Sequence, residues 1–519
     1  MSGELPHLLA AASDSGAIAS FEEAISDAFE PIATAVAGVV FYEFTLGPVS
    51  FPVIVLWLVA AAAIFTVYFR GIQVWGLRTA VDLVRGKYSR QSDPGEVSHF
   101  QALSSAVSGT VGLGNIAGVA VAVTIGGPGA TFWMILAGVL GMCTKFVECT
   151  LGVRYREVHE DGTVTGGPFR YMPVAFERFG SVVSKGAVGL FAIALILFGA
   201  LGGNAFQANQ TFAQAQEVTG GADGFLGSDG AALVFGIVLA LLIGLVILGG
   251  LSSIGRVTAR LVPVMAIVYI VACALVIGAN VTEVPQAIGE IVSGAFNPEG
   301  VTGGVLGVLI IGFQRAAFSN EAGVGSAPIV HSAAKTKHPV SEGFVAMLEP
   351  FIDTVVICTM TALTIVIADT TLYGDLREAA AAGENVSNDT GVVLTSRSFE
   401  TFLPGFGNVL ALAVALFAFS TLVTWSYYTL KAWTTLVGRS PAKELTFKVI
   451  FCVFTVIGTV VELGTVLDFA DSMLFVCAVF NLLACYLLLP KVREEVRAFR
   501  AGLRSGEITE VPKDERATT

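Results

Sequence analysis

Charged residues are scarce in this chain. Only 13% of its 519 residues are Asp, Glu, Lys or Arg, whereas 54% are hydrophobic. The mean hydropathy is +0.76. Soluble globular domains carry about 25% charged residues, so this composition excludes that class. Apolar runs long enough to cross a bilayer recur along the chain, which predicts an all-α polytopic membrane protein with the lipid bilayer as its solvent.

Motifs that are typical of enzymes and nucleic-acid-binding proteins are also missing. The seven cysteines and five histidines form no CxxC, HxxxH or HExxH pattern, so these kinds of metal site are excluded. No Walker-type glycine-rich loop with its lysine is present to hold ATP phosphates. The net charge of −12 argues against nucleic acid as a partner. We therefore expect neither an enzyme nor a bound cofactor.

The stretch from residue 104 to residue 129 is apolar but poorly suited to an unbroken helix. Gly109, Gly112 and Gly114 fall within six residues, and each costs about 1 kcal/mol relative to alanine in a helix interior. A break exposes backbone N–H and C=O groups, which a membrane tolerates only around an internal cavity. The GxxxG pair that starts at Gly114 also suits close helix packing. For the whole cluster we favour a binding gap.

A second stretch, residues 303–330, resembles the first. Its apolar half, residues 305–313, is followed by the polar residues Gln314, Arg315, Ser319, Asn320 and Glu321. We expect this helix to break near residues 312–314. Two interrupted apolar segments at corresponding places in two halves of a chain indicate the binding site of a secondary transporter.

Hydropathy and punctuation by Gly, Pro and charge predict eleven transmembrane helices. They are expected at residues 48–69, 102–125, 129–152, 186–213, 231–250, 257–279, 303–330, 343–368, 406–430, 445–463 and 469–489. Twenty-five of the 29 Lys and Arg residues then lie in alternate loops and in the tail; the others are Lys145, Arg315, Arg377 and Arg397. Because basic residues mark the cytoplasmic side, we predict an extracytoplasmic N-terminus and a cytoplasmic C-terminus.

The spans also predict the domain organisation. Residues 1–47 form an extracytoplasmic segment, within which residues 21–40 suit an amphipathic surface helix. Residues 48–490 form the transporter domain, and residues 491–519 form a cytoplasmic tail. After the first helix, residues 102–279 and 303–489 each hold five spans. Each set begins with a broken helix, and the two sets run in opposite directions, which is an inverted-topology repeat.

Six motifs, in order, resemble the alanine/glycine:cation symporter family, also called sodium:alanine symporters. They are GTVGLGNIAGVA (109–120), GGPGATFWM (126–134), LGMCTKFVE (140–148), QRAAFSNEAGVGSAPI (314–329), EPFIDTVVICTMTAL (349–363) and FSTLVTWSYY (419–428). The resemblance implies a leucine-transporter-type fold and uptake of alanine or glycine with sodium, in some members with protons.

A zwitterionic amino acid needs partners for its carboxylate and its ammonium. The second half of the first broken helix begins near Gly112, Gly114 and Asn115, and its N–H groups suit a carboxylate. The first half of the second broken helix would end near Phe313 and Gln314, and its carbonyls suit an ammonium. Asn115 either contacts the ligand or only caps a half-helix.

Further polar and aromatic residues are candidates for the walls of this pocket. Asn204, Gln207 and Asn209 interrupt the span at 186–213, where they either line a pocket or bridge helices. Gln207 is our choice, because the corresponding region faces substrate in the family's fold. Thr421 and Trp425 lie one helical turn apart and are expected on the same face, with Phe313 opposite.

Hydroxyls and carbonyls suggest a place for sodium. Ser420 and Thr421 are adjacent hydroxyls in an apolar run, and backbone carbonyls near Gly109 and Gly112 would complete an oxygen site. This pairing resembles the sodium site that leucine-transporter-type folds share. The alternative is that both hydroxyls bond to their own preceding helical turn.

Charged residues inside the predicted spans are functional candidates by default. Arg315 and Glu321 are expected to share the second gap, and Glu349 and Asp353, four apart, share one helix face. Lys145 and Glu148 are expected near the cytoplasmic end of their span. We expect such groups to lock helices together or to form a gate. Direct binding of a ligand or a proton is the alternative.

These features favour a secondary active symporter of the cell membrane that imports small neutral amino acids, alanine and glycine, with sodium. Proton-coupled transport of the same substrates is an alternative. A passive small-solute channel is less compatible with a chain that holds a full inverted repeat by itself. A membrane enzyme ranks last, because no catalytic constellation is visible.

Overall fold

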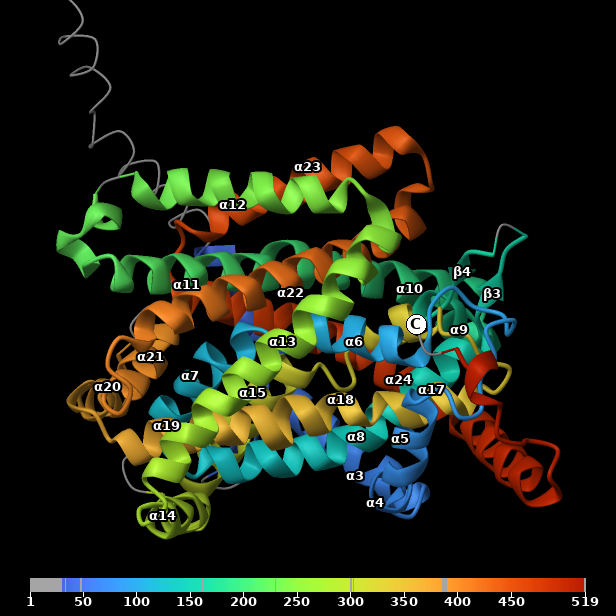
Figure 1. The fold of residues 1–519 in the computed structure, drawn as a ribbon, viewed down its shortest axis with the longest axis horizontal. Helices are drawn as coiled ribbons and strands as arrows, with labels where there is room; N and C mark the ends of the chain where they lie inside the picture. Colours follow the sequence, from blue (N-terminus) through green and yellow to red (C-terminus); the bar gives the residue numbers. More distant parts are fainter. Residues whose placement is uncertain are drawn as a thin grey trace, which may run out of the picture.

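The computed structural model describes residues 30–517 apart from 33, 47–48, 161, 229, 299–300, 302 and 385–389. The described chain is mainly helical, and its long helices run alongside one another (Figure 1). Two short antiparallel hairpins accompany them: β1 (Glu43–Leu46) with β2 (Val49–Pro52), and β3 (Glu157–Val158) with β4 (Val164–Thr165). The first 29 residues, which hold part of the predicted surface helix, lie outside the described residues. Residues 30–32 and 34–40 are helical.

The predicted spans coincide with single helices or with helices in series. They are α3 (Val53–Tyr68), α6 (His99–Thr110) with α7 (Ala117–Ile125), α8 (Ala130–Arg154), α10 (Ser181–Ile196) with α11 (Gly203–Val218), α12 (Ala231–Ile247), α13 (Gly250–Ala279), α15 (Gly304–Asn320) with α16 (Ala327–His331), α17 (Pro339–Ala346) with α18 (Leu348–Pro350) and α19 (Thr359–Ala368), α22 (Phe406–Val437), α23 (Pro441–Gly458), and α24 (Leu463–Ser505).

Length and composition support a membrane-spanning architecture. Within the described residues, six helices are long and apolar enough to cross a membrane, or seven if the bent pair of α6 and α7 counts as one span. The all-α polytopic prediction is confirmed in this form. Two boundaries differ from expectation. Residues 49–52 form strand β2, so the first helix begins at Val53, and α24 continues to Ser505, well into the predicted tail.

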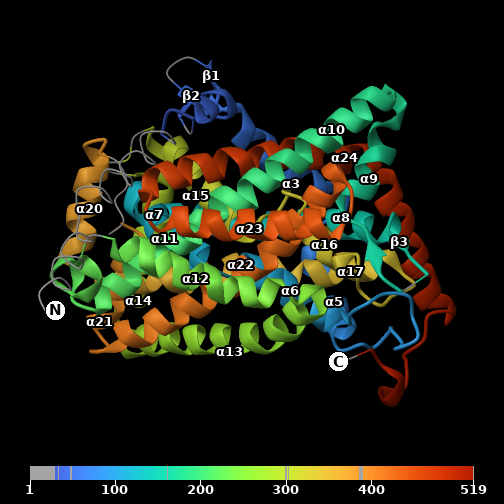
Figure 2. The same cartoon turned by 90° about the horizontal axis from the view of Figure 1, so that it is seen from above.

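Shorter elements gather at the two ends of the bundle. Helices α14 (Val284–Phe296), α20 (Thr371–Ala381) and α21 (Val392–Glu400) lie at one end. Helices α5 (Leu77–Val84) and α9 (Pro168–Phe176), the β3–β4 hairpin and the C-terminus lie at the other (Figures 1 and 2).

The first predicted helix break lies at the glycine cluster, as expected. Helix α6 begins with a capping box, in which Ser98 and Gln101 satisfy each other's backbone N–H groups. It ends at Thr110, and the chain leaves helical geometry at Val111 and Gly112. A short 3₁₀ turn, Leu113–Asn115, leads into α7. The two halves are bent by 60°.

The second interruption lies further along the chain than predicted. Helix α15 runs unbroken through residues 312–314 and ends at Asn320. Left-handed backbone angles then follow at Glu321 (φ 55°), Gly323 (φ 98°) and Gly325 (φ 89°). The prediction was wrong because it placed the break at the change from apolar to polar side chains. That change reflects new surroundings, whereas the two glycines supply the conformational freedom for the break.

Candidate functional site

The end of α6 packs against the middle of α22. The Thr421 hydroxyl donates to the Ser108 carbonyl at 3.0 Å, and the Trp425 indole N–H donates to the Gly109 carbonyl at 3.2 Å. In return, the Ser108 hydroxyl donates to the Ser420 carbonyl at 3.1 Å. Thr421 and Trp425 therefore face the same broken helix, as their spacing predicted.

Helix α11 reaches the break from another side. The Gln207 side-chain carbonyl accepts a hydrogen bond from the Leu113 N–H at 3.2 Å. A Cβ atom added at Gly112 would lie 2.6 Å from the Thr421 hydroxyl oxygen and 3.2 Å from the Gln207 amide nitrogen. Glycine at this position therefore allows the first break, α11 and α22 to come into close contact. The other α11 amides bridge helices, because Asn204 donates to the Phe451 carbonyl and Asn209 to the Val461 carbonyl.

Asn115 caps the break and ties it to a neighbouring helix. Its side-chain oxygen accepts from the Gly112 N–H at 2.9 Å. Its amide nitrogen donates to the Asp353 carboxylate at 2.7 Å, and the Ser319 hydroxyl donates to the other Asp353 oxygen at 2.8 Å. This arrangement favours capping over direct ligand contact for Asn115. Asp353 joins the two broken segments, which fits the predicted locking role.

Phe318 and Ser319, rather than Phe313 and Gln314, bring α15 to the first break. A Cβ atom at Gly114 would lie 3.3 Å from the Ser319 Cα and 3.7 Å from the Phe318 ring. Phe313 instead lines a small cavity of about 30 Å³ beside α3 and α8. Gln314 lines a cavity of about 390 Å³ beside α7 and α24. The two predicted residues are therefore misplaced, because the break was expected too early along α15.

Aromatic rings surround the break. The Phe318 ring lies 5.1 Å from that of Phe206 and 6.1 Å from that of Phe198, measured between centroids. Phe198 in turn lies 4.7 Å from Trp425 in an edge-to-face arrangement. These buried rings form the apolar wall that small-ligand sites need. Analysis of the sequence missed Phe318, although its place shortly before Gly323 and Gly325 was a usable signal.

Trp425 links the two broken segments. In addition to the Gly109 carbonyl, its indole N–H donates to the Glu321 carboxylate at 3.0 Å. Glu321 also accepts from the Ser326 hydroxyl across the second break. One side chain of α22 thus holds the end of α6 and the loop after α15 together.

Arg315 does not share the second gap with Glu321. It lies on α15, six residues before the gap, and its guanidinium pairs with Asp471 of α24. This pair borders the 390 Å³ cavity, which α7, α15 and the start of α24 line. The expectation of a shared gap was wrong because α15 continues beyond Arg315. The geometry still supports a role for Arg315 in holding α15 against α24.

Glu349 and Asp353 likewise contact different partners. Glu349 of α18 accepts from the Lys145 ammonium of α8 at 2.9 Å, and both side chains are fully buried. Asp353 lies within a π-helical stretch, Phe351–Cys358, and faces the first break instead. The i,i+4 spacing therefore does not make one functional pair of these carboxylates.

The contact of α6 and α22 is rich in oxygen atoms. The Ser420 hydroxyl donates to the Phe417 carbonyl of its own helix at 3.0 Å, so the back-bonding alternative describes Ser420. Thr421 instead reaches across to Ser108, and the Thr424 hydroxyl donates to the Ser108 hydroxyl at 3.0 Å. Hard cations prefer such oxygen ligands. Ser108 and Thr424 extend the oxygen set that the sequence suggested.

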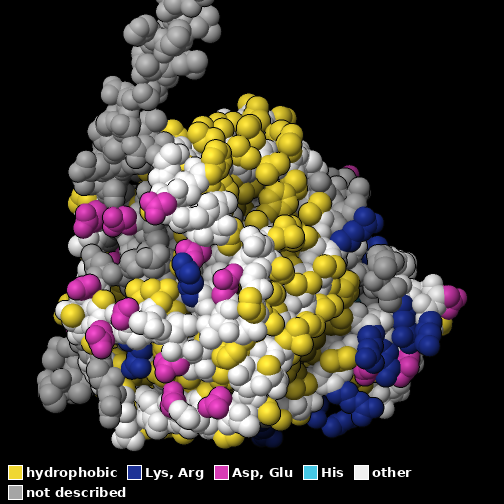
Figure 3. Space-filling model, turned by 60° about the vertical axis from the view of Figure 1, so that its left-hand side comes forward, with side chains coloured by type: hydrophobic (Ala, Val, Ile, Leu, Met, Phe, Trp, Pro, Cys, Tyr) yellow, Lys and Arg dark blue, Asp and Glu magenta, His cyan; other side chains and the backbone are white. Residues whose placement is uncertain are grey.

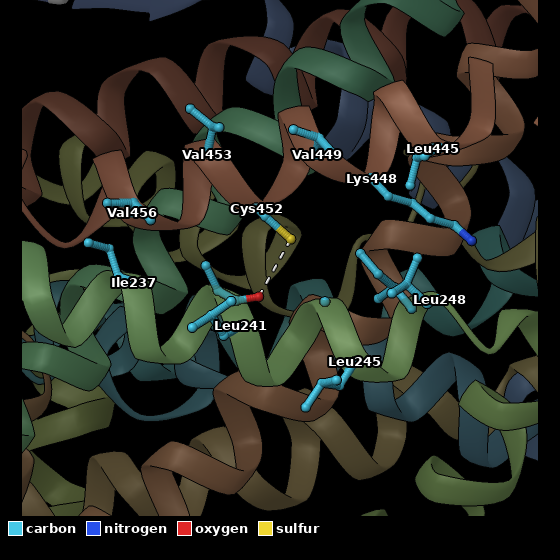
Figure 4. Close-up of a pocket in the computed structure, with 13 residues that line it drawn as sticks. Ile237, Leu241, Leu245, Leu248, Leu445, Lys448, Val449, Cys452, Val453 and Val456 are labelled. Atoms are coloured by element: carbon cyan, nitrogen blue, oxygen red, sulfur yellow. Dashed lines mark hydrogen bonds between the residues drawn. The ribbon is translucent and has the colours of Figure 1, made fainter. Parts of the chain in front are cut away.

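A separate groove of about 380 Å³ lies between α12 and α23 (Figure 4). Leucine, isoleucine and valine side chains line most of it, and Lys448 lies at one end. Its lining includes neither broken segment, so it is distinct from the site described above. Its exposed Leu241 and Leu245 suit contact with lipid chains.

Comparison with known proteins identifies the family. Residues 38–513 match the model of the sodium:alanine symporter family. The chain belongs to this family. It is 35% identical over 449 residues to the sodium/alanine symporter AgcS of Methanococcus maripaludis, covering 86% of this chain and 94% of that protein. It is 34% identical to the putative sodium/proton-dependent alanine carrier protein YrbD of Bacillus subtilis, covering 85% of this chain and 87% of that protein. The chain is therefore a transporter and not an enzyme.

A solved structure supports the fold. The crystal structure of MhsT in complex with L-phenylalanine superposes with a TM-score of 0.52 at 15% sequence identity, covering 75% of this chain and 88% of that chain. The present chain thus has the leucine-transporter-type fold that its resemblance to the family implied.

A methyl group at Gly112 tests the close approach at the first break. In Gly112→Ala, the added carbon displaces Thr421 or Gln207, and we expect initial alanine uptake to fall at least about tenfold. Gly118→Ala is the matched control, because no described atom lies within 4 Å of its added carbon. Uptake by both variants is measured in proteoliposomes with equal protein content. Equal uptake by the two variants would contradict the assignment.

Replacing the indole tests the link between the two broken segments. Trp425→Phe removes the N–H but keeps an aromatic ring, leaving the buried Glu321 oxygen without this donor. An unpaired buried group costs about 1–3 kcal/mol, so we expect the melting temperature and the uptake rate both to fall. Trp433→Phe is the control, since its N–H donates only to the Lys443 carbonyl near the surface. Wild-type values for Trp425→Phe would show that the link is dispensable.

Proposed function

We propose that this transporter is a secondary active symporter that imports alanine and glycine, driven by sodium. The observation that carries the proposal is the meeting of two broken helices with Gln207, Phe318, Thr421 and Trp425 in one buried place. Broken helices in this arrangement bind zwitterions and ions in secondary transporters. Sodium acts as the coupling ion, and no resident cofactor is needed.

The two helix breaks suit the two ends of an amino acid. The start of α7 presents backbone N–H groups and a positive dipole end that suit a carboxylate. Helix α15 ends at Asn320, and its last carbonyls suit the ammonium. We expect the bulky Phe318 and Trp425 rings to limit the side chain that can be bound, which favours alanine and glycine over larger amino acids.

Sodium fits the contact of α6 with α22. The carbonyls of Ser108 and Gly109 and the hydroxyls of Thr421 and Thr424 meet there. Ser420 and Gly112 adjoin the same contact, so the predicted sodium residues remain candidates together with Ser108. Several relatives are named as sodium symporters, including the probable sodium/glutamine symporter GlnT of Bacillus subtilis, which supports this choice of ion.

We further propose eleven membrane-spanning segments, arranged as one helix and two inverted sets of five, in the cell membrane. The N-terminus lies outside, and the C-terminus lies in the cytoplasm. The surface supports this orientation: on the face that Figure 3 shows, most Lys and Arg side chains gather toward one side and most Asp and Glu toward the other, with hydrophobic side chains between them.

Transport in proteoliposomes tests the proposed function. Labelled alanine and glycine should accumulate above the external concentration when sodium is higher outside, and this accumulation should collapse without the gradient. A channel would only equilibrate the label. Accumulation driven by a pH gradient in sodium-free buffer would favour proton coupling instead.

Removing hydroxyls tests the sodium site. Ser420→Ala with Thr421→Val removes oxygen ligands that contribute about 1.5–3 kcal/mol each by analogy with hydrogen bonds to charged groups. The sodium concentration for half-maximal uptake should therefore rise at least about tenfold. Thr429→Val serves as the control on the same helix, because its hydroxyl donates to the Trp425 carbonyl. An unchanged sodium dependence would remove these two residues from the site.

Cysteine labelling tests the orientation. Ala382 and Ser505 are exposed at opposite ends of the transporter in the proposed topology. A membrane-impermeant maleimide should label Ala382→Cys in intact cells, and Ser505→Cys only after the cells are opened. Labelling of the wild-type protein measures the background signal from its native cysteines. The reverse labelling pattern would invert the orientation.

A further inference from the structure

A line of buried titratable side chains runs toward the second break from the end of the helix bundle at which the C-terminus lies. His99, the first residue of α6, lies between the Ser89 hydroxyl and one oxygen of Glu342. The second Glu342 oxygen faces Nδ1 of His331, the last residue of α16. All four side chains are fully buried. The amide N–H of Ala517, near the C-terminus, donates to the Ser89 carbonyl, so the line begins beneath the tail.

The line continues through His331 to the charges around the second break. The Nε2 atom of His331 lies 3.9 Å from an oxygen of Glu349, and neither atom has a hydrogen-bond partner in the described structure. The other Glu349 oxygen binds Lys145. Lys145 interacts electrostatically with Glu321 and Glu148. Glu321 holds Trp425 at the candidate site, so this line of charges ends at the proposed substrate site.

The composition of this cluster requires exchangeable protons. It contains four carboxyl groups, Glu148, Glu321, Glu342 and Glu349, against two fixed positive charges, those of Lys145 and Arg156. Arg156 acts on Glu342 from the edge of the cluster. Buried charges must be paired, so balance requires two further protons on the imidazoles or the carboxyl groups. Imidazole is the side chain that gains or loses a proton most readily near neutral pH.

His331 is the member of the line whose contacts depend most on a proton. With both nitrogens protonated, the imidazolium presents one N–H to Glu342 and one to Glu349. A neutral imidazole has only one N–H, so one of the two carboxylates then faces a lone pair and is repelled. Because His331 ends α16 while its partners lie on α17 and α18, the proton decides how firmly α16 is held.

We propose that His331 and Glu349 form a proton-binding site, filled from the cytoplasm, that holds the inner end of the second broken segment closed. The proposal rests on the proposed function for the direction of transport and for the orientation in the membrane. When the proton leaves, one carboxylate contact of α16 is lost and the inner end opens more readily. The groups that face or act on this pair, or on its partner Glu342, from the surrounding elements are His99, Lys145, Glu148, Cys149, Arg156, Glu321, Glu342, Asp353 and Tyr428.

Internal pH is the variable that tests this site. Proteoliposomes are loaded with buffers from about pH 6 to about pH 8, the range in which imidazole titrates, while external pH, sodium gradient and membrane potential are held constant. Sodium-driven alanine uptake should rise severalfold with internal pH in the wild type. In His331→Gln it should be independent of internal pH, because the amide cannot titrate. His338→Gln should keep the wild-type profile, since this half-buried side chain lies outside the line.

A second measurement does not depend on transport. Nitrogen NMR of the histidine-labelled wild-type protein should show a histidine signal that titrates and that disappears in His331→Gln. A flat internal-pH profile in the wild type with intact sodium-driven uptake would overturn the proton site but not the proposed function. Absence of sodium-driven uptake would overturn the proposed function, and the NMR titration would then still decide whether His331 binds a proton. A wild-type profile in His331→Gln would also overturn the proposal.

Discussion

The need to satisfy backbone polar groups inside a membrane governs this structure. Each break in a buried helix frees N–H and C=O groups for which lipid offers no partner. The first break meets this need with the Asn115 cap, the Gln207 side-chain carbonyl and the Trp425 indole. At the second break, the Ala322 N–H donates to the Asn320 side-chain oxygen, and the Gly323 carbonyl accepts from the Asn481 amide. Trp425 also donates to the Glu321 side chain there. Two breaks that share one donor must lie side by side, and this proximity creates the site.

Close approach is the second consequence of that constraint. Gly112 and Gly114 face side chains or backbone at distances that leave no room for a larger residue without movement. Glycines therefore set the geometry of the site, whereas side chains on α11, α15 and α22 supply its chemistry. This division explains how α11 and α22, which are not interrupted at the site, can hold residues of a site that forms only around broken helices.

The sequence was sufficient to predict the helical membrane class, the first break and the approach of α22 to it. Glycine clusters and hydroxyl pairs report local backbone freedom and chemistry, so the sequence indicated that Gly112, Thr421 and Trp425 lie together at the first break. Their roles in binding remain predictions. The second break was misplaced by several residues, and Phe313 and Gln314 were assigned to it in place of Phe318 and Ser319. Hydropathy records the surroundings of side chains and not the path of the backbone. The partners of Arg315 and Lys145 lie 156 and 204 residues away, a separation that no local pattern encodes.

Charge is distributed unevenly between the first break and the C-terminal end of the bundle. Close to the first break, the groups that suit a zwitterion are backbone dipoles and neutral side chains, together with the Glu321 and Asp353 carboxylates already held by Trp425 and Asn115. Formal charges with titratable partners lie toward the C-terminal end, around Lys145, His331 and Glu349. Glu321 belongs to both regions, because it accepts from Trp425 and interacts electrostatically with Lys145. The proposed substrate site and the proposed proton site therefore meet at this residue and are not electrostatically independent.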